Sequence, residues 1–252
     1  MALFAAVLTF FSGFGLGTIL LPIFVIFMPI SIAIAATAIV HLTNNLFKLG
    51  LTFKKINFRV LLYFGAPALV ATVAGALILN TLSTEQNIYT WSRFSLSGEI
   101  TILKFSIGLL IIIFALLELL TSFKEISFTA KWIPVGGILS GFFGGLSGSQ
   151  GALRSAFLIK TGLSKESFIA TGVAIAVIVD VARIFVYGFT FFNFAMLREE
   201  AVEGLVFTAI IGGLVGVFLG KRLLTKVTFK YVQILVSSFL LFIGSALVLG
   251  FL

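Results

Sequence analysis

Residues 144–155 read GGLSGSQGALRS and lie within an apolar stretch that runs from about 132 to 160. Its glycines allow the chain to turn and leave backbone N–H groups open to a ligand. A helix that starts after such a turn carries partial positive charge at its N-terminus and is suited to anions. Ser149 and Gln150 add neutral hydrogen-bond donors, and Arg154 adds a planar cation that fits an oxyanion. The stretch therefore predicts a helix break that binds an anion, with close helix packing as the alternative role of its glycines.

The composition defines the environment of this stretch. The chain has 252 residues, of which 60% are hydrophobic and 10% are charged, and its mean hydropathy is +1.22. Soluble domains carry roughly 25% charged residues, so the sequence predicts an all-α protein that crosses a membrane several times. The chain has no cysteine and one histidine, and we expect no metal and no cofactor. The net charge of +8 comes in short runs between apolar segments, which predicts the lipid bilayer and not nucleic acid as partner.

Eight apolar stretches follow one another along the chain. They cover about 3–28, 30–51, 58–80, 100–122, 132–160, 166–190, 201–220 and 230–252. Most are long enough for the roughly 20 residues that a membrane-spanning helix needs. The longest polar break, 81–99, is expected to be a loop.

The two halves of the chain repeat one another. A glycine-rich motif at 12–17 is echoed at 147–151, and an Ala-Thr pair at 36–37 is echoed at 170–171, an offset near 135 residues. Internal repeats of this kind are typical of secondary transporters. We therefore expect a first transmembrane repeat over 1–122, a cytoplasmic linker over 123–131 and a second transmembrane repeat over 132–252.

The distribution of basic residues indicates how these segments cross the membrane. If segments one and five, which glycines interrupt, enter the membrane and return on the same side, twelve basic residues share one face and three lie opposite. The twelve are Lys48, Lys54, Lys55, Arg59, Lys124, Lys131, Lys160, Lys165, Lys221, Arg222, Lys226 and Lys230, and the three are Arg93, Lys104 and Arg198. Eight plain spans would instead divide them seven against eight. Because cytoplasmic loops are enriched in Lys and Arg, the first arrangement is favoured.

Each half then holds three spans, an odd number, so the two repeats are predicted to be inverted. This topology places the chain in the cell (inner) membrane with both termini outside. Segments one and five are described either as re-entrant hairpins or, in the alternative, as spanning broken helices. Non-helical backbone at that depth is tolerated only inside protein or beside a water-filled cavity.

Polar side chains within the predicted spans cost about 2.5 to 3.5 kcal/mol each when they are ionisable, so each needs a reason. Segment two carries a stripe of them at helical spacing, formed by Thr37, His41, Asn44 and Lys48, with Asn45 beside it. Segment six carries Asp180 and Arg183. At an offset of 135, Asn45 corresponds to Asp180 and Lys48 corresponds to Arg183.

Two interpretations of these residues stay open at this stage. In the first, Lys48 and Arg183 attract an anion, and Asp180 neutralises one of them or carries a proton. In the second, Asp180 and Arg183 form an ion pair within their own helix, while Lys48 extends to the cytoplasmic interface.

An enzyme is not expected from the remaining motifs. Gly145 to Gly148 fit the short G-x-S-G pattern of intramembrane serine proteases. Those enzymes place a histidine after the serine, whereas His41 precedes Ser147 by about a hundred residues. A serine without a base is not activated.

Two sets of motifs resemble the TauE/SafE sulfite exporter family of membrane transporters. The first copy is formed by Gly13, Gly15, Gly17 and Pro22 with Ala36-Thr37, and the second by Gly148 and Gly151 with Ala170-Thr171. Three departures from the family pattern are Leu16 in place of a glycine, Ser149 and Gln150 within the second glycine run, and Phe157 in place of a proline. The resemblance implies transport of small organosulfur anions such as sulfite, sulfonates or sulfoacetate, driven by a proton gradient.

The sequence as a whole predicts a secondary transporter of a small anion, with its site between the two glycine-rich breaks near the midplane. The predicted substrate-binding residues are Gly15, Gly17, Asn44, Asn45, Lys48, Gly148, Ser149, Gln150, Gly151, Arg154 and Arg183. Asp180, or with less support His41, is the predicted protonation site. A passive anion channel is the alternative function, and the sequence leaves open whether the chain forms a homodimer.

Overall fold

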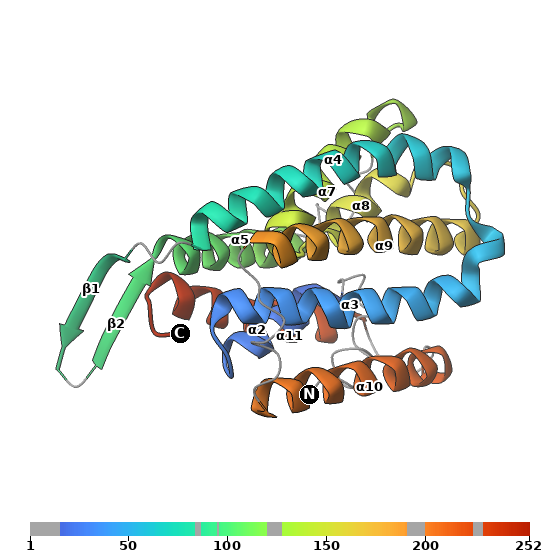
Figure 1. Cartoon of the computed structure of the whole chain (residues 1–252). Helices are drawn as coiled ribbons and strands as arrows, with labels where there is room; N and C mark the ends of the chain where they lie inside the picture. Colours follow the sequence, from blue (N-terminus) through green and yellow to red (C-terminus); the bar gives the residue numbers. More distant parts are fainter. Residues whose placement is uncertain (1–15, 84–86, 95, 120–127, 191–199, 224–228) are drawn as a thin grey trace.

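The computed structural model describes residues 16–83, 87–94, 96–119, 128–190, 200–223 and 229–252 (Figure 1). Its α-helices are α2 (Leu16–Val25), α3 (Ile30–Thr52), α4 (Phe58–Ser83), α5 (Ile102–Leu119), α7 (Ile133–Ser147), α8 (Gly151–Leu158), α9 (Lys165–Thr190), α10 (Glu200–Leu223) and α11 (Phe229–Val248). Two short 3-10 helices, η1 (Phe53–Lys55) and η2 (Ala130–Trp132), precede α4 and α7. Two strands, β1 (Asn87–Arg93) and β2 (Leu96–Thr101), lie between α4 and α5.

Six of the helices coincide with the stretches that were expected to span a membrane. Within the described residues, Ile30–Lys55, Phe58–Ser83 and Lys165–Thr190 are long and apolar enough to cross one. Ile102–Leu117, Val202–Gly216 and Ile234–Val248 are shorter apolar helices. Large side chains such as Val70 and Phe189 are 73% and 76% exposed, as expected for helices that face lipid. The prediction of a helical membrane protein is confirmed.

The helices α3 and α9 run side by side through the molecule (Figure 1). α4 packs along α7, and α5 packs along α11. At the end where α3 finishes and α9 starts, the backbone N–H of Asn57 donates to Thr171 Oγ1 at 2.9 Å. Polar residues from the two halves of the chain therefore lie on neighbouring helices, α3 and α9.

The predicted break in segment five is present and makes a helical hairpin. α7 ends at Gly148, whose φ of +80° is a left-handed conformation that favours glycine, and α8 starts at Gly151. The chain turns back on itself, because Phe128 N–H donates to Ala156 O at 3.4 Å and the Phe128 and Phe157 rings stack 4.0 Å apart. The glycines allow the turn, and Phe157 of α8 packs against Phe128 and Gly136 and so holds the two helices of the hairpin together.

The corresponding segment in the first half is only partly described. The predicted turn at 13–18 lies mostly outside the described residues, as does Gly15. α2 covers 10 residues and leads through a short turn to α3, which starts after Pro29. Ten helical residues rise about 15 Å, half the thickness of the hydrocarbon core.

Glycines also hold α7 close to α4. A Cβ on Gly141 would lie 2.6 Å from the Cα of Ala68, and one on Gly145 would lie 2.9 Å from the carbonyl carbon of Thr72. The two backbones therefore touch along successive turns, and there is no room for side chains between them. Close helix packing, the alternative role considered for the glycines, is therefore found at Gly141 and Gly145, whereas Gly148 makes the predicted turn.

The prediction of a loop at 81–99 is wrong. α4 continues to Ser83, and β1 and β2 form an antiparallel hairpin that projects from one end of the molecule (Figure 1). Its residues include strand formers such as Ile88, Tyr89 and Trp91. Contacts with the C-terminus stabilise it, because Trp91 Nε1 donates to Leu249 O at 2.8 Å and Glu99 N–H donates to Gly250 O at 3.0 Å. An isolated hairpin is only marginally stable, so the two strands depend on these contacts with residues that are far away in the sequence.

Candidate functional site

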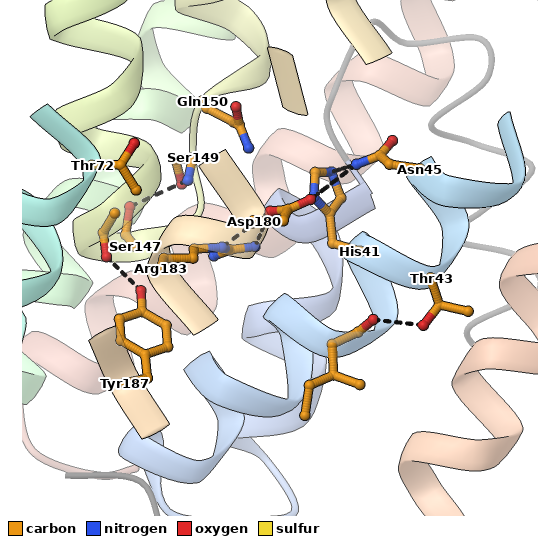
Figure 2. Close-up of polar contacts among 12 residues, drawn as sticks. His41, Thr43, Asn45, Thr72, Ser147, Ser149, Gln150, Asp180, Arg183 and Tyr187 are labelled. Carbon is orange, nitrogen blue, oxygen red and sulfur yellow. Dashed lines mark hydrogen bonds and ion pairs between the residues drawn. The ribbon is translucent and has the colours of Figure 1, made fainter. Parts of the chain in front are cut away.

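The carboxylate of Asp180 is the centre of a buried polar cluster between α3 and α9 (Figure 2). Its Oδ2 accepts hydrogen bonds from His41 Nδ1 at 2.6 Å and from Asn45 Nδ2 at 3.1 Å. Its Oδ1 accepts from Arg183 Nε at 3.1 Å and lies 2.8 Å from Arg183 Nη2. The carboxylate is an acceptor only, which identifies His41 Nδ1 as the protonated ring nitrogen. One acid thus joins side chains from both halves of the chain.

Helical periodicity brings these side chains together. His41 and Asn45 are four residues apart on α3, so they share one face. Asp180, Arg183 and Tyr187 fall at intervals of three and four on α9 and also share a face. Since the two helices are neighbours, the two faces meet. The ion pair of Asp180 with Arg183, one of the two interpretations of the sequence, is present, but it is not confined to its own helix.

Arg183 extends from this cluster to the break between α7 and α8. A Cβ on Gly148 would lie 2.5 Å from Arg183 Nη1, so only a glycine leaves space for the guanidinium there. Arg183 is fully buried. Among the described residues, none accepts a hydrogen bond from its Nη1. The guanidinium therefore uses one edge for Asp180 and presents an unpaired donor to the break.

Gln150 presents a second unpaired donor at the same break. Its Oε1 accepts a hydrogen bond from Arg154 Nη1 at 3.1 Å, which fixes the orientation of the amide. Its Nε2 is buried and has no hydrogen-bond partner in the described part of the chain. Buried donors are rarely left without partners, so each such atom calls for an explanation.

Several contacts fix the shape of the break. Tyr187 donates its hydroxyl to Gly145 O, a carbonyl that the end of α7 leaves without a helical partner. Ser140 Oγ donates to Gln150 O at 3.1 Å from the preceding turns of α7. Ser147 Oγ donates to Phe143 O at 3.2 Å. It also accepts the Ser149 N–H at 3.4 Å (Figure 2). No role for Tyr187 was predicted from the sequence, although its position on the same helical face as Asp180 and Arg183 was a usable signal.

The start of α2 meets the same region from the first half. A Cβ on Gly17 would lie 3.6 Å from Gly148 O, 3.6 Å from Thr37 Cγ2 and 3.7 Å from His41 Cδ2. Gly17 is thus close to the second glycine-rich break and to the polar stripe of α3. Thr37 Oγ1 is buried without a hydrogen-bond partner among the described residues.

The other predicted residues surround this centre at different depths. Asn44 is buried, and neither its Nδ2 nor its Oδ1 has a hydrogen-bond partner within the described ranges. Lys48 and Arg154 are half-buried, and Arg154 Nε is 3.5 Å from the position of a Cβ on Gly172 of α9. Gly151 is the first residue of α8. Of the predicted residues, Gly15 alone falls outside the described part.

Positive charge prevails in and around the cluster. Lys48, Arg154 and Arg183 contribute three cations and Asp180 contributes one anion, which gives +3 − 1 = +2 with His41 neutral. Low-dielectric surroundings strengthen the effect of this excess. Within the described residues, no group of three or more His, Cys, Asp or Glu side chains could hold a metal ion. The arrangement suits a small anion.

Comparison with known proteins identifies the family of the chain. The family model described as "Sulfite exporter TauE/SafE" matches residues 1–247. The chain belongs to the TauE/SafE family. No curated protein and no solved structure matches it significantly.

Membership of the TauE/SafE family confirms the resemblance inferred from the two glycine-rich motifs. The match extends over both halves of the chain, including every described residue of the polar cluster. TauE/SafE proteins are membrane transporters, and the apolar helices of this chain agree with that class. The cluster around Asp180 is therefore a candidate transport site of a TauE/SafE protein.

Proposed function

We propose that this TauE/SafE protein is a secondary transporter of a small organosulfur oxyanion of the sulfite, sulfonate or sulfoacetate type. The observation that carries the proposal is the pair of unpaired buried donors, Arg183 Nη1 and Gln150 Nε2, at the Gly148 break. An unsatisfied buried donor costs about 1–3 kcal/mol, and more when it is charged. An oxyanion bound at the break would accept hydrogen bonds from both and remove this cost.

The chemistry of the break favours a compact oxyanion. A guanidinium donates in a planar fork that matches two oxygens of a sulfonate or sulfite. The first N–H groups of α8, which begins at Gly151, add partial positive charge. The side chains of Asn44, Ser149 and Arg154 are the further candidates for ligands, and the excess positive charge attracts the anion from a distance.

The proposal places this site between two inverted repeats, 1–122 and 132–252. Asn45 and Asp180 support it, because these residues correspond at an offset of 135 and donate and accept the same hydrogen bond. A two-fold axis that passes between two equivalent residues brings them into such contact. The hairpin of α7 and α8 is then re-entrant, and the basic ends of α3 and α9 lie on the cytoplasmic side with both termini outside.

Proton coupling completes the proposed mechanism. Asp180 and His41 are the two groups in the cluster that exchange a proton most readily near neutral pH when their surroundings change. A proton bound there together with the anion would reduce the charge that crosses the membrane.

The binding site can be tested by ligand stabilisation. The purified protein is heated in sulfite, methanesulfonate, acetate or phosphate, and we expect the organosulfur anions to raise the melting temperature most. Arg154→Ala should abolish this increase, whereas Lys160→Ala, which removes an exposed cation just after α8, should leave it unchanged. Equal responses of the two variants would remove Arg154 from the site.

The mode of transport needs a second measurement in proteoliposomes. A secondary transporter gives saturable uptake that depends on the pH gradient. Flux that rises linearly with concentration and ignores the gradient would instead establish a passive anion channel.

A further inference from the structure

The two oxygens of the Asp180 carboxylate are divided between the two halves of the chain. Oδ2 accepts hydrogen bonds only from α3, through His41 Nδ1 at 2.6 Å and Asn45 Nδ2 at 3.1 Å. Oδ1 contacts only α9, through Arg183 Nε at 3.1 Å and Nη2 at 2.8 Å. No other hydrogen bond or ion pair to these two oxygens is found in the described part of the chain, and all four side chains are buried. His41 and Arg183 therefore compete for one negative charge.

From this arrangement we infer that His41 is the residue that carries the coupling proton, and that its protonation releases Arg183 from Asp180 to bind the anion. The inference rests on the proposed function, since it names the coupling group of the same site. It also reverses the order of the two candidates, because Asp180 stays ionised while His41 changes charge.

The tautomer of His41 leaves Nε2 unprotonated, so this nitrogen can take the proton. Nδ1 donates to Asp180, so neutral His41 has its unprotonated nitrogen at Nε2. Asn45 Nδ2 lies 3.1 Å from Nδ1 and 3.4 Å from Nε2, against the ring edge that carries both nitrogens. The Cδ2 atom beside Nε2 faces Gly17, at the junction of the two glycine-rich regions. A proton arriving at Nε2 thus binds next to the proposed anion site.

Charge balance links this proton to the anion. With His41 neutral, the negative charge of Asp180 cancels the positive charge of Arg183. With His41 protonated, Asp180 has two cationic partners, and one unit of positive charge is no longer compensated. Arg183 already directs an unpaired Nη1 toward Gly148, so it is the partner that an oxyanion can engage. One bound proton therefore prepares the site for one negative charge.

Other ionisable groups near His41 do not offer a better partner for this exchange. On α9 the neighbours are Asp180, Arg183 and Tyr187, on α8 Arg154, and on α3 itself Lys48. α2 contains no ionisable residue, and α10 contains them only within 200–203 and 221–222, at its two ends. Arg183 and Arg154 each carry a positive charge and Asp180 carries a negative one, so cations outnumber anions around His41. An added anion supplies the missing negative charge, so proton and anion should bind cooperatively.

The chain has a single histidine, which makes this inference directly measurable. Protein labelled with 15N-histidine in lipid bilayers gives one imidazole spin system by solid-state NMR, and its chemical shifts report tautomer and charge. We expect the Nδ1–H tautomer at high pH. Adding methanesulfonate, which stays anionic throughout, should move the titration midpoint about one to two pH units upward, the shift that corresponds to a typical coupling between two sites.

The possible results separate the inference from the proposed function. If methanesulfonate raises the melting temperature but leaves the His41 titration unchanged, the proposed function stands and the role of His41 is refuted. If methanesulfonate has neither effect at any pH, both are refuted. Arg183→Gln should remove the upward shift, and the control Lys160→Gln, at an exposed position, should retain it. A shift that survives in Arg183→Gln would also overturn the inference, and the wild-type titration decides it even if that variant does not fold.

Discussion

Replacing Asp180 by Asn tests whether the buried carboxylate holds Arg183 in place. The substitution keeps the shape of the side chain but removes the charge that pairs with Arg183 Nε and Nη2. Arg183 is fully buried, so it becomes an uncompensated buried cation. Breaking a buried ion pair in this way costs about 3–5 kcal/mol. For a chain of this size, each kcal/mol lowers the melting temperature by about 2–4 °C, so we expect a decrease of roughly 6–20 °C.

The same variant should respond more strongly to anions than the wild type does. Arg183 in Asp180→Asn lacks its internal counter-ion, and an oxyanion at the Gly148 break can replace it. A tenfold gain in affinity corresponds to about 1.4 kcal/mol, or roughly 3–6 °C of additional stabilisation at saturating methanesulfonate. The melting temperature with and without methanesulfonate therefore gives both the cost of the broken pair and its rescue.

Two further variants make the test decisive. Glu203→Gln applies the same chemical change to an exposed carboxylate on α10 and should alter stability by no more than about 0.5 kcal/mol. Asp180→Asn combined with Arg183→Met removes both charges and should recover most of the lost stability while losing the anion response. A single variant as stable as the wild type, or a double variant no more stable than the single one, would refute the reasoning.

Three more predictions concern the packing around the site and the β-hairpin. Gly141→Ala should lower the melting temperature by roughly 2–12 °C, since its Cβ would lie 2.6 Å from the Cα of Ala68 and overpacking costs about 1–3 kcal/mol, whereas Gly204→Ala, with no atom within 4 Å, should not lower it. Gly17→Ala should fold normally, because the nearest atoms are 3.6 Å away, but its methyl group should weaken methanesulfonate binding measured by thermal shift. Trp91→Phe should speed hydrogen exchange in the β-hairpin without changing anion binding, because it removes the hydrogen bond of the indole to the main chain after α11 and keeps an aromatic ring that can pack on Phe251.

Local chemistry explains why the helices and the break at Gly148 were predictable. Long apolar runs define helices such as α4, predicted over 58–80 and found over Phe58–Ser83. A dense group of glycines interrupts the fifth apolar stretch, and the helix ends there because Gly148 adopts a conformation that other residues avoid. Both signals lie within a few residues of the feature that they predict.

Contacts between distant segments were not predictable in the same way. The hairpin of β1 and β2 depends on Trp91 meeting the C-terminus, 158 positions away. The polar stripe of α3 was visible, but nothing local shows that His41 Nδ1 points at Asp180, 139 positions away. Tyr187 likewise contacts Gly145 O only because α9 packs beside the end of α7. The sequence thus indicates which residues form the candidate site, but not which side chains they contact.

The offset of 135 residues connects these two levels. It is the spacing of the repeated sequence motifs, and it is also the separation along the chain of Asn45 and Asp180, which share a hydrogen bond of 3.1 Å. If a two-fold axis passes between them, the pair cannot be chemically symmetric. Two carboxylates at that distance would repel in a buried site, and two amides would leave Arg183 without a counter-ion. An amide in one half and a carboxylate in the other avoid both the repulsion and the missing counter-ion. The negative charge then lies on the side of the axis where Arg183 reaches the Gly148 break.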